Sequence, residues 1–163
     1  MELKKLMEAL AIEAGLLDDL LALLERESAE LGNIDIIAMA ASNQDKEMLI
    51  TKITEHSPHM KQAVSACAVR EGLSASTTLG ALAEHLSKKG RKELLLEQQR
   101  LNKTADKIKQ AAAQNQDIAE RFAAMVTTSL GLITRLINQS NVYGASGGYQ
   151  QRPASAVMIN REA

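Results

Sequence analysis

The residues best suited to acid–base or metal chemistry are three histidines and one cysteine. His56 and His59 flank a Ser-Pro pair, and histidines three residues apart could bind a metal ion. No third ligand of a suitable type is placed nearby in the sequence, however. His85 stands alone, and Cys67 shares an apolar helical face with Val64, which favours a buried side chain over a nucleophile. These residues therefore predict no metal centre.

Two polar features could also be taken for ligand sites. The segment Tyr143-Gly144-Ala145-Ser146-Gly147-Gly148 is glycine-rich, but it follows a helix and lacks the lysine and the next helix of a phosphate-binding loop. Asn115 is predicted to fix helix register, with ligand binding as the alternative. Because no nucleophile, base and oxyanion donor come together, the sequence predicts a non-enzymatic protein without a cofactor.

The dominant element is a predicted helix from Leu94 to Tyr143. Apolar positions recur along it in steps of three and four, the spacing of a helix that faces another helix. At about 1.5 Å per residue it would span roughly 75 Å, so partner helices must flank much of it. The stripe comprises Leu101, Ala105, Ile108, Ala112, Asn115, Ala119, Phe122, Val126, Ser129, Ile133, Leu136, Ser140 and Tyr143.

Two further helices are predicted at the N-terminus. A leucine-rich helix runs from Glu2 to Leu31, Gly32 takes the left-handed position at its end, and Asn33 caps the next helix. The second helix runs from Ile34 to His56 and forms an antiparallel hairpin with the first. Its apolar side is expected to comprise Ile34, Ile37, Ala41, Met48, Leu49 and Ile53.

The middle of the chain is less regular. Ser57-Pro58 is predicted to end the second helix and begin a short one that Gly72 stops. Ser76 can cap another short helix, and the long helix begins near Lys88. We expect this segment, from Pro58 to Ser87, to close one end of a bundle.

The predicted fold class is all-α. It is an elongated antiparallel helical bundle or coiled coil with two long N-terminal helices, short connecting helices and one very long C-terminal helix. A composition of 45% apolar and only 2% aromatic residues suits such a bundle better than an enzyme pocket. Residues 1–141 are expected to form one domain, and residues 142–163 a flexible tail.

Charge and cysteine usage limit the partners and the compartment. A formal net charge of −1 gives no global attraction to nucleic acid or to a membrane surface. From Met1 to Glu55 acids outnumber bases twelve to five, and from Lys88 to Lys109 bases outnumber acids eight to three. We interpret this as complementarity within the chain, with a partner-binding patch as the alternative. One cysteine, no signal peptide and no membrane span together predict a cytoplasmic protein.

The sharpest local contrast lies in the last helix, where Arg135 is the only charged residue from Phe122 to Gln151. A weakly charged, apolar helical surface can receive an amphipathic helix of another protein at little ionic cost. We expect the binding residues to be Met125, Leu130, Ile133, Leu136 and Ile137, and the alternative is that they pack on the two N-terminal helices.

The chain resembles the FlgN family of flagellar type III export chaperones. The likeness covers about Met1 to Tyr149. It consists of the leucine-rich first helix with its Gly32-Asn33 turn, Lys46-Glu47-Met48-Leu49 in the second helix, and Leu101-Asn102 and Asn115-Gln116 in the long one. The tail Tyr143-Gly144-Ala145-Ser146-Gly147 is the most diagnostic part, although Gly144 departs slightly from the family pattern.

The resemblance implies a cytosolic chaperone that has neither catalytic activity nor a cofactor. It would bind the C-terminal helical region of flagellar hook-associated (junction) proteins and deliver them to the flagellar export gate and its ATPase components. Tyr143 would dock at the gate, with a plain helix-end tyrosine as the alternative. The exposed apolar end also allows a homodimer. The competing class is a structural coiled-coil adaptor or self-associating bundle without an export role.

Overall fold

The structure is a computed structural model that describes residues 2–140, with side chains described for residues 2–135. It contains four helices: α1 (Glu2–Asn33), α2 (Ile36–Arg70), α3 (Leu79–Lys88) and α4 (Glu93–Ser140). Residues 2–140 contain no strand. The predicted all-α class, with two long N-terminal helices and one very long C-terminal helix, is confirmed.

The chain divides into two units, Met1–Ala119 and Glu120–Ala163. The first unit holds α1, α2, α3 and the first half of α4, and the second begins within α4. Each unit is described by itself below.

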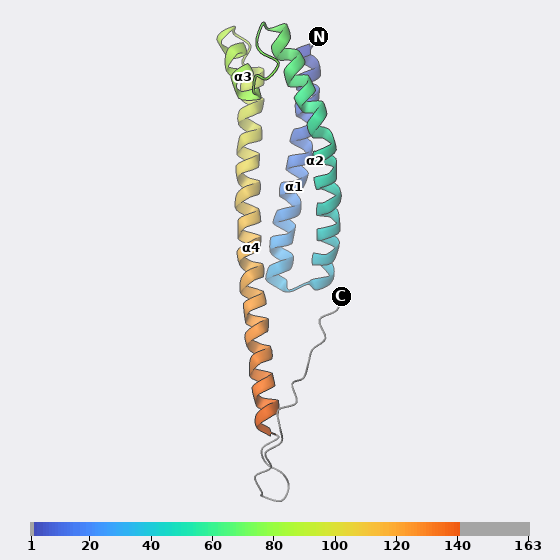
Figure 1. The fold of residues 1–163 in the computed structure, drawn as a ribbon, viewed down its shortest axis with the longest axis vertical. Coiled ribbons are helices and arrows are strands. Elements are labelled where there is room, and N and C mark those ends of the chain that lie inside the picture. Colours follow the sequence, from blue (N-terminus) through green and yellow to red (C-terminus); the bar gives the residue numbers. More distant parts are fainter. Residues whose placement is uncertain (1, 141–163) are drawn as a thin grey trace, which may run out of the picture. The chain divides into compact units, whose positions relative to one another are not determined.

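In the first unit, α1 and α2 form an antiparallel hairpin, and α3 lies at the end of the hairpin where α1 begins and α2 ends (Figure 1). The core gathers at this end of the hairpin because all four helices contribute small or aliphatic side chains to it. This confirms that the middle segment closes one end of the bundle. The buried cluster consists of Leu6, Leu10, Ala14, Val64, Cys67, Ala68, Leu82, Ala83, Leu86, Leu94 and Leu101.

The turn between α1 and α2 differs from the prediction. Gly32 remains helical, and Ile34 takes the left-handed conformation instead, with a φ of 56°. Asp35, not Asn33, is the N-cap of α2, since its Oδ1 accepts a hydrogen bond of 3.0 Å from the backbone N–H of Ala38. The preference of glycine for the left-handed region therefore placed this turn two residues too early.

The predicted break at Ser57-Pro58 is wrong, because α2 continues through Pro58 to Arg70. Pro58 removes one backbone donor and disfavours helical geometry in the residue before it. Those local costs are outweighed by packing on either side, since Met60 and Val64 join the core after the proline and His56 contacts α1 before it. Tertiary contacts override a local signal here.

The predicted apolar side of α2 is also wrong over its first half. Ile37 is 85% exposed and Met48 is 52% exposed, while Ser42 is fully buried against α1. Arg26 Nε donates a hydrogen bond of 3.2 Å to Ser42 Oγ, and the Ser42 hydroxyl donates one of 2.9 Å to Glu30 Oε1. This half of the hairpin is therefore joined by polar contacts, and Ile34 and Ala41 are exposed with the others.

The connections around α3 follow the predicted stop at Gly72, but neither the predicted cap nor the predicted start of the long helix. Gly72 stops α2 with a φ of 79°, as expected from its lack of a side chain. Thr78, not Ser76, caps α3 by accepting a hydrogen bond of 3.3 Å from Ala81 N–H. Gly90, with a φ of 85°, separates α3 from α4, so the long helix begins at Glu93 and not near Lys88.

Candidate functional site

The second unit presents an apolar helical surface that has few charges. Met125, Leu130 and Ile133 are 56%, 58% and 52% exposed. Val126 and Leu132 on the same stretch are exposed as well. Large apolar side chains normally lose exposure on folding, so a series of them along one helix marks an interaction surface more often than chance exposure does.

These side chains share one half of the helix circumference. Successive residues turn by about 100° around a helix, which brings residues 122, 125, 126, 130, 132 and 133 to the same half. The opposite half carries Ala123, Thr127, Gly131, Thr134 and Arg135. We call the residues of the apolar half, Phe122, Met125, Val126, Leu130, Leu132 and Ile133, the apolar strip.

The hydroxyl groups on this stretch of α4 donate hydrogen bonds to carbonyl groups of the helix itself. Thr127 Oγ1 donates to the Ala123 carbonyl at 2.9 Å, and Ser129 Oγ donates to the Met125 carbonyl at 2.9 Å. Thr134 makes the same contact one turn further on. Of these three residues, Ser129 lies on the same half of the helix as the apolar strip, so a partner that covers the strip need not supply an acceptor for its hydroxyl, which lowers the polar cost of burying it.

Three of the six predicted binding residues, Met125, Leu130 and Ile133, are thus exposed on one helix. Leu136 and Ile137 belong to α4, but their side chains are outside the described residues. Tyr143 also lies outside the described residues. The binding roles of all six stay predictions.

His56 of α2 makes a contact with α1 that holds the two helices together. His56 Nε2 is 3.0 Å from the carbonyl oxygen of Ala9, so this nitrogen is the donor, and it lies 3.9 Å from Glu13 Oε2. The His56 and His59 ring centroids are 6.4 Å apart. Within residues 2–140, no group of three or more His, Cys, Asp or Glu residues could hold a metal ion.

Cys67 is buried in the core, where it is 2% exposed. Burial is the main cause that raises the pKa of its thiol above the ordinary value, and the nearby Glu71 carboxylate adds to the effect. A thiol held in its protonated form is a poor nucleophile. The arrangement therefore agrees with a small buried side chain.

Asn115 is buried between α4 and α1 in the first unit. Its Nδ2 donates hydrogen bonds of 2.8 Å to the Leu24 carbonyl and 2.9 Å to Glu27 Oε2. Both partners belong to α1, so the amide fixes the position of α4 along α1 as a register residue would. These contacts occupy its donor group, while its Oδ1 is buried without a hydrogen-bond partner among the described residues.

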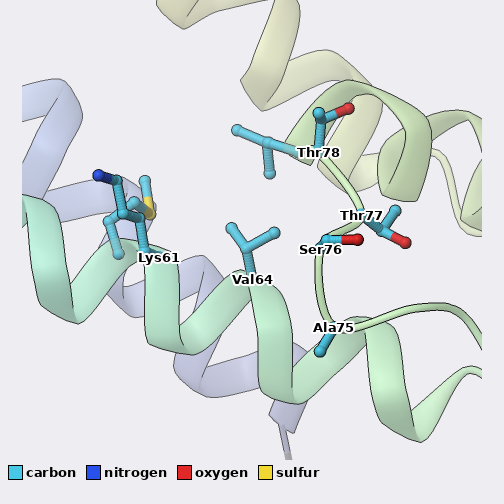
Figure 2. Close-up of a pocket in the computed structure, with 8 residues that line it drawn as sticks. Lys61, Val64, Ala75, Ser76, Thr77 and Thr78 are labelled. Carbon is cyan, nitrogen blue, oxygen red and sulfur yellow. The ribbon is translucent and has the colours of Figure 1, made fainter.

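A small hollow lies between α2 and the connection to α3. Figure 2 shows Val64 of α2 facing Ser76, Thr77 and Thr78 of the connection. The cavity has a volume of about 420 Å³, and Met60 and Leu79 complete its apolar part. Lys61 is its one ionisable lining residue, so it offers no acid–base pair for catalysis.

Among the described residues, no helix is both long and apolar enough to cross a membrane.

Comparison with known proteins gives one result that covers nearly the whole chain. A family model described as FlgN protein matches residues 1–151. This range includes all four helices and the segment with Tyr143. No curated protein and no solved structure matches the chain.

Proposed function

Because the chain belongs to the FlgN family of flagellar export chaperones, we propose that it binds the C-terminal helical region of flagellar hook-associated (junction) proteins in the cytoplasm. It then delivers them to the type III export gate. The chaperone acts by covering the apolar face of its substrate and carries out no catalysis. The observation that carries the proposal is the exposed apolar strip of α4.

The apolar strip suits an amphipathic helix as its ligand. Helical ligands bind through apolar residues that recur every three or four positions, and the strip repeats at the same spacing. Burying one aliphatic side chain of this size stabilises a complex by about 1.5–3 kcal/mol. Several such contacts suffice for a reversible complex, which a chaperone that must release its substrate requires.

We assign substrate binding to Met125, Leu130, Ile133, Leu136 and Ile137. The first three are exposed in the described part of α4, and the last two continue the same spacing. Tyr143 follows the helix and is the proposed docking residue for the export gate, which separates the two tasks along the chain.

A double substitution tests the substrate site. Leu130→Ser with Ile133→Ser in the full chain should weaken binding of a junction protein's C-terminal helical fragment, measured by calorimetry, by at least about tenfold. Ile36→Ser removes an equally apolar side chain that is 69% exposed on α2, and it should change the affinity less than about twofold. Both variants should keep the thermal midpoint of the parent because the altered side chains are exposed.

Two outcomes would contradict the assignment. If the double variant binds like the parent, the strip is not the substrate site. If the full chain binds no junction protein and instead forms a stable oligomer by light scattering, it is a structural coiled-coil adaptor.

The gate assignment is tested separately by truncation. A chain ending at Ser140 should still bind the junction fragment but lose capture of the export gate component. Tyr143→Ala in the full chain should reproduce this loss, while Tyr149→Ala serves as the matched control. A truncated chain that binds both partners normally would remove the tail from the mechanism.

A further inference from the structure

The first half of α4, together with Lys92 just before it, carries a second exposed surface, which is basic and not apolar. Lys92, Leu96, Gln99, Lys103 and Lys107 recur at steps of three and four. At about 100° per residue these positions fall on one side of the helix. Leu96 is 64% exposed among the lysines, and this surface belongs to the first unit. We call these five residues the basic face.

The acidic N-terminal half of the chain does not neutralise the basic face. Lys89 and Arg91 bind Glu71, at 3.0 and 2.7 Å. Arg100 binds Asp18 at 2.8 Å and Glu97 at 3.4 Å, and Lys109 lies 3.8 Å from Asp106.

For Lys92, Lys103 and Lys107, no carboxylate in the described part of the chain lies within ion-pair distance. Ion pairs with acidic residues of the same chain therefore account for only some of the basic residues between Lys88 and Lys109.

The basic face is also hollowed. A groove of about 410 Å³ is lined by Leu96, Gln99 and Lys103, with Lys107 at its end. Its edge is fixed in position, because Asp18 binds Arg100 at 2.8 Å and Thr104 at 3.5 Å. Leu96 is the apolar side chain of this lining and Lys103 and Lys107 are its lysines, so the groove favours a ligand that carries both apolar and acidic groups.

We propose that this groove is a docking site for an acidic amphipathic helix of another protein. Lys103 and Lys107 are one turn apart, so carboxylates four residues apart on the partner helix can face both. Leu96 lies seven residues before Lys103, which is about 10 Å along the helix. An apolar side chain seven residues from the acidic pair would therefore cover Leu96.

This site is independent of the proposed chaperone activity. It shares no residue with the apolar strip. The groove lies on a basic surface, whereas the apolar strip is nearly uncharged. A chain that binds substrate but not an acidic helix would overturn this inference alone, and the reverse result would overturn only the substrate assignment.

The test uses the full chain and two synthetic helical peptides. One carries the Glu-x-x-x-Glu pair with a leucine seven residues away, and its control replaces both glutamates with glutamine. In fluorescence anisotropy the acidic peptide should bind at least about tenfold more tightly, in line with coupling between close charge pairs. Raising the salt from about 50 to about 300 mM should weaken it, because screening shortens from ~14 Å to ~6 Å.

Variants of the chain locate the contact. Lys103→Glu with Lys107→Glu should reduce affinity for the acidic peptide by at least about tenfold, and Leu96→Ser by about threefold to tenfold. Lys109→Glu with Lys88→Glu is the matched control, because it changes the net charge equally, Lys109 lies on another side of α4 and Lys88 lies on α3, and it should change affinity less than about twofold. Unchanged circular dichroism would establish that all variants are folded.

Four results would overturn the proposal. One is equal affinity for the two peptides, and another is an equal effect of the variants and the control, which would indicate net charge alone. The third is tighter binding to phosphatidylserine vesicles than to the acidic peptide, which would assign the face to a membrane surface. The fourth is a homodimer, seen by light scattering, that only the lysine variant dissociates.

Discussion

At the scale of single residues, Glu71 shows how one carboxylate joins two segments. It lies just after α2 and accepts hydrogen bonds from Arg91 at 2.7 Å and Lys89 at 3.0 Å, both in the connection between α3 and α4. These two cations lower the pKa of Glu71 from 4.5 to about 2, and the Arg91 hydrogen bond is the largest cause. The ionised carboxylate is therefore favoured in the folded state.

This lowered pKa predicts a specific pH dependence. Between pH 4.5 and 2 the unfolded chain binds more protons at Glu71 than the folded chain does, so lowering the pH favours unfolding. Glu71→Gln should lower the free energy of unfolding at pH 7, and its deficit relative to the parent should shrink as the pH falls through this window. Urea denaturation at a series of pH values measures both quantities.

The matched control is Glu8→Gln, which removes an exposed carboxylate on α1. At pH 7 it should change the free energy of unfolding by less than about 0.5 kcal/mol. A deficit for Glu71→Gln that stays constant down to the acid limit would show that the amide disturbs packing and that charge is not the cause.

At the scale of elements, α2 is the helix that the sequence describes least well. It contains Pro58 in its interior, and its first half packs on α1 through Ser42 and charged groups instead of isoleucines. Pro58 and Thr54 are both exposed, so water can reach the Thr54 carbonyl that lacks a backbone donor. The proline is therefore tolerated without being required for the helix.

Replacing this proline should stabilise the protein. A proline in a helix interior destabilises the folded state by roughly 3 kcal/mol. Its removal also raises the conformational entropy of the unfolded chain, which offsets about 0.4–1 kcal/mol of the gain in stability. Pro58→Ala should therefore raise the free energy of unfolding by about 2–2.6 kcal/mol, measured by urea denaturation. Gln62→Ala, at an exposed position on the same helix, should change it by less than about 0.5 kcal/mol.

The opposite sign for Pro58→Ala would also be informative. A loss of stability would mean that the local geometry imposed by the proline positions Met60 and Val64 in the core. The continuous helix would then depend on the residue that local rules expect to interrupt it.

At the scale of the whole molecule, stability rests on aliphatic packing. Leu6, Leu10, Leu82, Leu86 and Leu94 are fully or almost fully buried in one cluster. Several of the ion pairs, such as Arg100 with Asp18, lie on the surface. Surface pairs contribute only about 0–1 kcal/mol each, whereas burial of a leucine contributes about 1.5–3 kcal/mol.

This balance predicts a weak effect of salt. Raising the salt from about 50 to about 500 mM should shift the thermal midpoint, followed by circular dichroism, by no more than about 5 °C. Leu82→Ala, in contrast, should lower the free energy of unfolding by about 2–5 kcal/mol. A fall of ~10 °C or more on adding salt would show that ion pairs carry a larger share than their exposure indicates.

The sequence by itself determined the helices of this protein. Long stretches with apolar residues every three or four positions favour helices, and Gly72 marks a real boundary. The near absence of charge after Phe122 likewise identified the candidate surface, because composition needs no coordinates to be seen.

Only the tertiary structure decided which side of α2 is buried. Ile37 and Met48 have the spacing of an inner face, but Arg26 and Glu30 of α1 satisfy Ser42 instead and turn the isoleucine outward. The tertiary structure also showed which basic side chains form ion pairs with carboxylates, because contacts such as Arg100 with Asp18 join residues far apart in the chain. Periodicity shows that a helix has an apolar face, but the partner helix determines whether that face is covered.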